Sequence, residues 1–162
     1  MGNIKTILAG LSLTMAVGMP AVASDELTMV VGTYTDQSTS DGMYVYRFNQ
    51  RTGKSQLVGD VQAGNPSFLM MNPDANRVYA VSEYDDGRQS LGAFILNKKE
   101  GTMTPLGYQK CGTKATRQEN KMPGAAPCNV MLYGGHVVTS NYNGGDISVF
   151  PIKEDGSVAP ES

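Results

Sequence analysis

The chain has 162 residues, of which 40% are hydrophobic and 17% are charged, and its formal net charge is −2. This length suffices for one domain of ordinary soluble composition. Because the net charge is small and no long run of like charge occurs, the sequence predicts no nucleic-acid partner and no attraction to an anionic membrane surface.

The first 23 residues are typical of a cleavable signal peptide. Lys5 provides the positive start, an apolar run covers residues 7–17, and Pro20 precedes the small residues Ala21-Val22-Ala23. The run is shorter than the roughly 20 residues of a membrane span, and no cysteine stands at the cut to carry a lipid anchor. We therefore predict cleavage after Ala23, a domain over residues 24–162, no membrane anchor, and a periplasmic or secreted protein.

After this segment, short β-rich runs alternate with Gly, Asn, Asp and Pro clusters, and helical periodicity is absent. Three groups of runs recur about every fifty residues. In this alignment Tyr34, Tyr84 and Tyr142 are equivalent. Three glycines are also equivalent, and each stands where a hairpin turn requires positive φ: Gly53, Gly101 and Gly156. The runs cover residues 29–34, 42–49 and 51–58; 78–84, 91–97 and 99–106; and 137–142, 145–152 and 154–160.

Two further strands precede the second and third groups. They cover residues 65–77 and 126–135, with Pro66 and Pro127 at matching places near their starts. One complete unit therefore has four strands in about fifty residues, which is the size of a propeller blade. We predict an all-β fold of about three β-propeller blades of four antiparallel strands, the first of which begins at its second strand.

Three blades do not close a propeller ring, because known rings have four to eight. The sequence therefore predicts either a fragment of a larger ring or an assembly of several copies, and the fragment is the favoured expectation.

A series of motifs at blade-sized spacing runs through residues 28–160: VVGTYT, NPSFL, NPD, VYAVSEY, PCNV and VVTSNYNGGDISVFPI. In this order they resemble the lactonase family of seven-bladed propellers, which also has a branch of fungal muconate cycloisomerases. The resemblance implies 6-phosphogluconolactonase activity, the hydrolysis of 6-phosphoglucono-δ-lactone in the pentose phosphate pathway, or hydrolysis of a related sugar lactone. It also implies that the catalytic His, Arg and acidic residues lie in later blades, beyond Ser162, so the chain alone is expected to be inactive.

Lactone hydrolysis needs an activated water or a general base, together with donors for the oxyanion of the intermediate. Propellers place such groups at one end of the central channel. Glu83 and Asn141 share one repeat position in the alignment, with Thr33 as their counterpart. The alternatives are that Glu83 hydrogen-bonds neighbouring backbone, that the asparagines stabilise turns, and that the tyrosines pack the blades. The substrate-binding candidates on this rim are Asn65, Glu83, Asn129, Asn141 and Tyr142, with Tyr84 beside them.

The remaining reactive side chains carry little signal. His136, the only histidine, follows Gly134-Gly135 and is expected to be an exposed turn residue. Cys111 and Cys128 could pair in an oxidising compartment, and the sequence leaves this open. No ligand cluster, phosphate loop or dinucleotide fingerprint occurs, so we predict neither a metal site nor a cofactor.

The leading hypothesis is a lactone hydrolase of the 6-phosphogluconolactonase type, with a small sugar lactone as its partner. The predicted export conflicts with the cytoplasmic pentose phosphate pathway and points to another sugar lactone. A non-catalytic exported propeller that binds a ligand or a protein remains the alternative, because a fold does not fix a function. An inert gene fragment is the third hypothesis.

Overall fold

The computed structural model describes residues 24–114 and 119–162, and the predicted signal peptide lies outside them. The described residues form ten strands in three antiparallel sheets, and no helix occurs among them. The prediction of an all-β fold is therefore confirmed. No helix that could cross a membrane is found in this part of the chain.

The middle sheet is a complete blade, which we call blade 2. Its strands follow one another as an antiparallel meander in the order β4-β5-β6-β7. Their bounds are β4 (Leu69–Met71), β5 (Arg77–Ser82), β6 (Ser90–Asn97) and β7 (Thr102–Lys110). The first strand is much shorter than the predicted run over residues 65–77, because a turn follows at once: Asn72 accepts the amide hydrogen of Ala75 at its carbonyl.

The two flanking sheets are incomplete blades. Among the described residues, blade 1 has three strands in the order β1-β2-β3, and they correspond to the second, third and fourth strands of blade 2, as predicted. Blade 3 has the order β10-β9-β8, and its fourth strand is reduced to a single bridge between Ile152 and Val158. The bounds are β1 (Glu26–Gly32), β2 (Gly42–Asn49), β3 (Ser55–Gln62), β8 (Pro127–Tyr133), β9 (His136–Asn141) and β10 (Asp146–Pro151).

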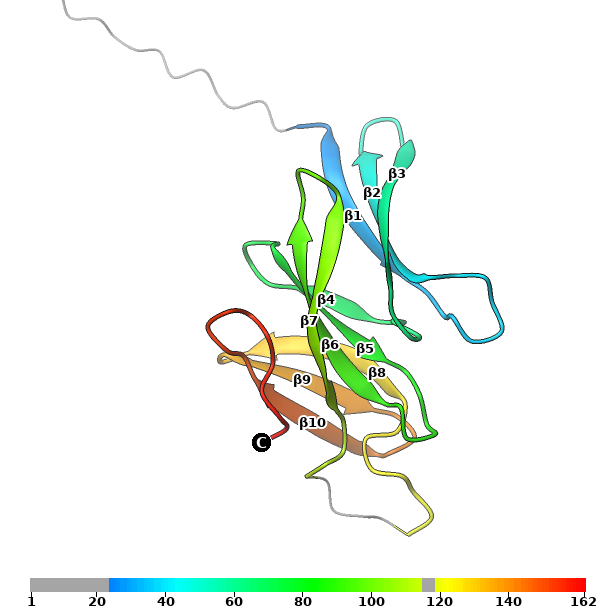
Figure 1. Cartoon of the computed structure of the whole chain (residues 1–162), viewed down its shortest axis with the longest axis vertical. Helices are drawn as coiled ribbons and strands as arrows, with labels where there is room; N and C mark the ends of the chain where they lie inside the picture. Colours follow the sequence, from blue (N-terminus) through cyan, green and yellow to red (C-terminus); the bar gives the residue numbers. More distant parts are fainter. Residues whose placement is uncertain (1–23, 115–118) are drawn as a thin grey trace, which may run out of the picture.

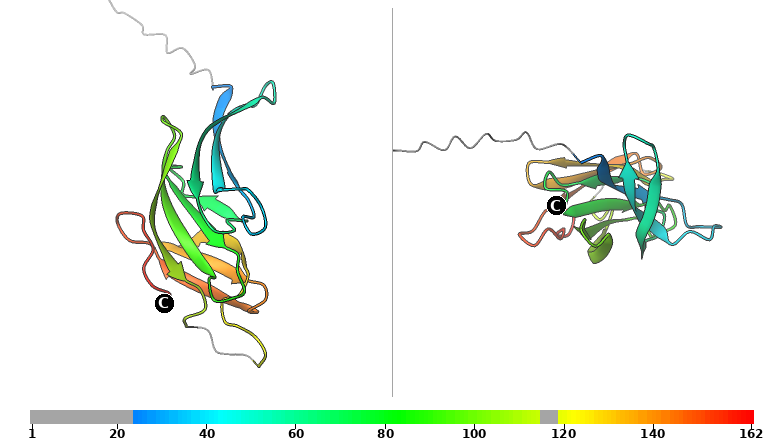
Figure 2. Two further views of the ribbon diagram at one scale, coloured as in Figure 1. Left: turned by 45° about the vertical axis from the view of Figure 1, so that its right-hand side comes forward. Right: turned by 90° about the horizontal axis from the view of Figure 1, so that it is seen from above.

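The three blades are stacked face to face along the long axis of the molecule (Figure 1). Blade 1, in blue and cyan, lies at the top, blade 2 in green lies in the middle, and blade 3 in yellow and orange lies at the bottom; the turned views agree (Figure 2). The aligned glycines lie in turns at φ +70° (Gly53), +75° (Gly101) and +84° (Gly156), which confirms the predicted hairpins.

The alignment of the tyrosines is wrong by one residue in blade 2. The amide N–H of Glu83 donates to the carbonyl of Asn65 (3.1 Å), and that of Tyr142 donates to Ala126 (2.9 Å). Asn65 and Ala126 precede the matching Pro66 and Pro127 and share an unusual positive φ, of 42° and 52°. Glu83 is therefore the counterpart of Tyr142, and Tyr84 comes one position later.

The strand register extends this correction to blade 1. A bulge follows Val45 in β2 and Ala93 in β6, and these residues pair with Val30 and Tyr79, respectively. Counting four residues onward from Val30 and Tyr79 makes Tyr34 the counterpart of Glu83. Thr33, Ser82 and Asn141 stand one position before Tyr34, Glu83 and Tyr142 and are therefore equivalent to one another. The predicted pairing of Glu83 with Asn141 is thus also wrong.

Apolar side chains fill the two spaces between the blades. Val78, Ala80 and Phe94 of blade 2 pack against blade 1, and the opposite face of the same strands packs against blade 3 through Tyr79 and Leu91. Successive strand residues point to opposite faces, so the same strands supply apolar side chains to both spaces. Both faces of blade 2 are therefore buried. Each blade is thereby held at a fixed position relative to its neighbour, which sets the geometry of the rim.

Candidate functional site

In each blade, the connection that enters the first strand and the connection that leaves the second strand lie at the same end of the strands. In the stacked blades these ends lie side by side. Tyr34, Glu83 and Tyr142 are equivalent here, each just beyond the second strand of its blade. We call this end the rim. Its loops span residues 33–41, 83–89 and 142–145, and they follow β1, β5 and β9 in Figure 1.

Glu83 is held at the rim by hydroxyl groups from two other segments. The phenol of Tyr34 in blade 1 donates to Oε2 of Glu83 at 2.9 Å, and the hydroxyl of Ser67 donates to the same oxygen. The hydrogen bond to Glu83 raises the pKa of Tyr34, so the phenol remains a donor at neutral pH. Among the described residues no hydrogen bond reaches Oε1, which is available to accept one from a ligand or water.

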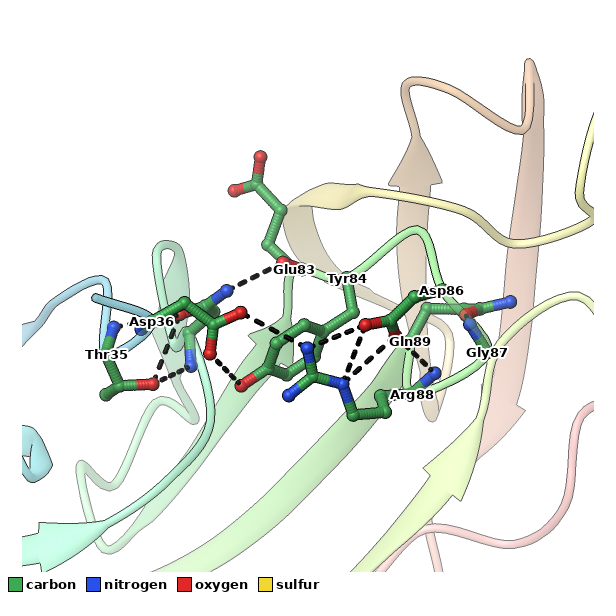
Figure 3. A network of polar contacts seen from close by, with 9 residues as sticks. Thr35, Asp36, Glu83, Tyr84, Asp86, Gly87, Arg88 and Gln89 are labelled. Atoms are coloured by element: carbon green, nitrogen blue, oxygen red, sulfur yellow. Dashed lines mark hydrogen bonds and ion pairs between the residues drawn. The ribbon is translucent and has the colours of Figure 1, made fainter. Parts of the chain in front are cut away.

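Beside Glu83, a second polar network joins the rim loops of blades 1 and 2 (Figure 3). The Arg88 guanidinium contacts Asp86 at 2.6 Å and Asp36 at 3.2 Å, and it stacks on the ring of Tyr84 at 3.7 Å. Arg88 lowers the pKa of Asp86, mainly through their hydrogen bonds. These exposed ion pairs contribute little stability individually. They orient the loops on either side of Glu83, whose carboxylate points away from this network (Figure 3).

Blade 3 joins the same rim through a side-chain contact. The amide nitrogen of Asn143 donates to Oδ2 of Asp85 at 3.1 Å. The three rim loops are therefore connected in sequence, from blade 1 to blade 2 and from blade 2 to blade 3.

Two of the predicted site residues are buried, and their side-chain amides form hydrogen bonds within the chain. Asn65 is only 6% exposed; its Oδ1 accepts from the amides of Thr35 (2.8 Å) and Asp36 (3.1 Å), and its Nδ2 donates to the Glu83 carbonyl (3.2 Å). Asn141, at 2% exposed, donates to Asp146 (2.7 Å) and Ser148. Asn65 thus positions Glu83, while Asn141 fixes the end of blade 3.

The other three predicted residues, Glu83, Asn129 and Tyr142, are more exposed than Asn65 and Asn141. Tyr142 is 79% exposed and Tyr34, its counterpart in blade 1, is 57% exposed, so these two side chains do not pack between the blades. Tyr84 is half-buried, with Arg88 stacked on its ring. Asn129 lies in β8, paired with Ser140 and half-buried. The predicted binding roles of Glu83, Asn129 and Tyr142 stay predictions. Sequence reasoning missed Tyr34 and Ser67 as site residues, because their contacts with Glu83 join positions 49 and 16 residues apart.

The two thiols and the histidine have hydrogen-bond partners other than Glu83. Cys111 and Cys128 are both unpaired, which answers the open question of a disulfide. Burial raises the pKa of Cys111 to about 12, so it is an unreactive thiol. His136 begins β9 and is half-buried, with Nδ1 2.9 Å from the carbonyl of Gly134. In residues 24–114 and 119–162 no three metal-ligating side chains gather.

A groove of about 490 Å³ occupies the opposite end of blades 2 and 3. His136 and Arg77 line it together with the turns at residues 72–76 and 134–135. The Arg77 guanidinium is occupied by the carbonyl of Asp155 (3.0 and 3.1 Å), so this cation joins two blades. The rim around Glu83 is therefore the stronger candidate site.

The four-stranded meander of blade 2 and the packing of blade on blade define a class of protein, the β-propellers. The family model "Lactonase, 7-bladed beta-propeller" matches residues 28–162, and the chain belongs to this lactonase family. It is 30% identical over 131 residues to a 6-phosphogluconolactonase of Bacillus subtilis and 28% identical over 134 residues to one of Formosa agariphila, covering 79% and 80% of this chain. The chain spans about a third of these curated relatives, 34% and 35% of their lengths.

Solved structures agree with this membership. A candidate 6-phosphogluconolactonase of Bacteroides fragilis is 39% identical, with a TM-score of 0.77 over 88% of this chain and 37% of its own. A second candidate from Bacteroides uniformis is 37% identical, with a TM-score of 0.75 over 85% of this chain and 36% of its own. The chain is thus a lactonase-family protein whose described blades match part of a seven-bladed propeller.

Proposed function

We propose that this chain takes part in the hydrolysis of a sugar lactone at the rim, where Glu83 binds substrate hydroxyl groups. The observation that carries this proposal is the fixed position of the Glu83 carboxylate. Oε2 accepts hydrogen bonds from Tyr34 and Ser67, and Oε1 is left for a ligand. Hydrogen bonds from hydroxyl groups to a carboxylate are among the stronger polar contacts, at about 1.5–3 kcal/mol each.

In the reaction, water adds to the lactone carbonyl and the bond between the carbonyl carbon and the ring oxygen then breaks. The ring oxygen takes a proton and becomes a hydroxyl group. Glu83 orients the sugar so that its carbonyl meets the attacking water, which lowers the entropic part of the barrier. The base and the oxyanion donors are expected from the blades that follow the third, in keeping with the family resemblance.

A neutral sugar lactone suits this rim better than a phosphorylated one. The three rim loops carry the carboxylates of Asp36, Asp41, Glu83, Asp85 and Asp86 and one guanidinium, that of Arg88, which is bound to Asp36 and Asp86. A phosphate group would be repelled by this local excess of negative charge. The proposed substrate is therefore an unphosphorylated aldonolactone, with 6-phosphoglucono-δ-lactone as the competing candidate.

The activity is tested in two proteins. The purified chain alone should leave the hydrolysis of glucono-δ-lactone and of 6-phosphoglucono-δ-lactone at the spontaneous rate, because its rim is open to water. A chimera in which residues 28–162 replace the matched third of the Bacillus subtilis enzyme should hydrolyse a lactone. In this chimera Glu83→Gln should lower kcat/KM by about 10- to 100-fold, the effect of losing one charged hydrogen bond.

Asp74→Asn is the matched control, because it removes a carboxylate at the opposite end of the blades. An active chimera that Glu83→Gln leaves unchanged would remove Glu83 from the site. A folded chimera without activity would favour the non-catalytic propeller.

We also propose that the chain is exported, on the basis of Lys5, the apolar run and Ala21-Val22-Ala23. Expression in a Gram-negative host should yield periplasmic protein whose intact mass corresponds to a chain beginning at Ser24. Recovery of full-length protein from the cytoplasm alone would contradict this. An exported enzyme would meet free aldonolactones, which agrees with the charge of the rim.

A further inference from the structure

The hydrogen bonds around Glu83 leave three side chains that can only accept further ones. An ionised carboxylate accepts hydrogen bonds and donates none, so the hydroxyl groups of Tyr34 and Ser67 donate their single hydrogens to Oε2 of Glu83. In residues 24–114 and 119–162 no further donor reaches these two hydroxyl oxygens or Oε1 of Glu83. We call the side chains of Tyr34, Ser67 and Glu83 the acceptor cluster, because no hydrogen is left in it to donate to a ligand.

Asn65 holds Tyr34 and Glu83 beside each other, although these two residues belong to different blades. Its Oδ1 accepts the amide hydrogen of Thr35, the residue after Tyr34, at 2.8 Å. Its backbone carbonyl accepts from the amide of Glu83 at 3.1 Å, and its Nδ2 donates to the Glu83 carbonyl at 3.2 Å. Since Asn65 is buried, the acceptor cluster is in place before a ligand arrives, which reduces the ordering cost of binding.

Two acceptors of the cluster lie close together, and the residues that carry them are joined by a direct contact. The Tyr34 phenol oxygen is 2.9 Å from Oε2 of Glu83, and Oε1 is bonded to the same carbon as Oε2. The Tyr34 side chain is largely exposed, whereas Ser67 is half-buried. A ligand that satisfies both the phenol oxygen and Oε1 therefore needs two hydrogen-bond donors on neighbouring atoms. Hydroxyl groups on adjacent carbons of a sugar ring have this arrangement.

We propose that Tyr34 and Glu83 together bind two adjacent hydroxyl groups of the substrate ring. One hydroxyl group donates to Oε1 of Glu83, and its neighbour donates to the phenol oxygen of Tyr34. Tyr34 is then a specificity-determining residue, and lactones with a vicinal diol are preferred over lactones that lack one. This inference rests on the proposed function and names the feature of the sugar that the rim recognises.

The test measures the binding of two stable cyclic polyols to the purified chain by NMR titration, and it requires no catalysis. The parent polyol, 1,5-anhydro-D-glucitol, has adjacent hydroxyl groups around its ring, and its 3-deoxy form has no adjacent pair. We expect the 3-deoxy form to bind about 10-fold more weakly, because one hydrogen bond is lost. Tyr34→Phe should weaken binding of the parent polyol by about 10-fold and change that of the 3-deoxy form by less than about 2-fold, since this form donates to Glu83 alone.

Tyr133→Phe is the matched control, because Tyr133 is also exposed but lies beside the groove at the opposite end of the blades. It should leave both dissociation constants unchanged. If Tyr34→Phe weakens the binding of both polyols equally, Tyr34 only supports the position of Glu83, and the recognition of a diol is overturned while the proposed function stands. If Glu83→Gln leaves binding of the parent polyol unchanged, or if neither polyol binds, the inference and the role of Glu83 in the proposed function both fail.

Discussion

Gly32→Ala is expected to prevent stable folding of blade 1 against blade 2. A Cβ at this position would lie 1.9 Å from the carbonyl oxygen of Pro66 and 3.1 Å from its carbonyl carbon. Because these are backbone atoms, the clash is relieved only if β1 moves away from the segment before β4. We expect a loss of about 3 kcal/mol or more, a large part of the 5–15 kcal/mol of a typical domain.

Urea unfolding followed by circular dichroism measures this loss. Gly53→Ala is the matched control, because Gly53 has a φ of +70° but no atom within 4 Å of an added Cβ. Its cost is limited to the left-handed backbone, about 1 kcal/mol. Equal midpoints for the two variants would show that close approach at Gly32 does not matter.

Asn65→Ala should have the second largest effect, because one side chain joins the loop of blade 1 to the end of β5. The variant leaves the amides of Thr35 and Asp36 without their acceptor and frees the carbonyl of Glu83. Unpaired buried groups cost about 1–3 kcal/mol each, so we expect a loss of about 3 kcal/mol. Backbone strain is a minor factor, since the equivalent Ala126 already adopts a φ of 52°.

Asn65→Asp separates the contributions, because an aspartate keeps the acceptor for Thr35 and Asp36 and loses the donor to Glu83. Its midpoint in urea should lie between those of the parent chain and Asn65→Ala. If Asn65→Asp is as damaging as Asn65→Ala, the acceptor bonds to the blade 1 loop are not the main contribution. If Asn65→Ala is neutral, the loop is held by other contacts.

The blade architecture could be predicted because its signals are local. Alternating apolar residues, the glycines of the hairpin turns and the matched prolines each act over a few neighbouring residues. The positive φ of Gly53, Gly101 and Gly156 is the outcome of such local signals. The shortness of β4 was missed, because the turn at Asn72 starts sooner than the run of apolar residues indicates.

The arrangement of the side chains at the rim could not be predicted, because it depends on contacts between residues far apart in the sequence. Tyr34 reaches Glu83 across 49 positions, and Asn65 reaches Thr35 across 30. Blade 2 carries Glu83 where blade 3 carries Tyr142, and its own Tyr84 follows one residue later, so an alignment of the tyrosines shifts blade 2 by one residue. The sequence by itself determined the all-β blades and their turns, because these rest on short-range periodicity, and its ordered motifs carried the resemblance to the family. Only the tertiary structure decided that Glu83 is held by Tyr34 and Ser67 while Asn141 is buried, because side-chain partners are chosen where separate blades meet.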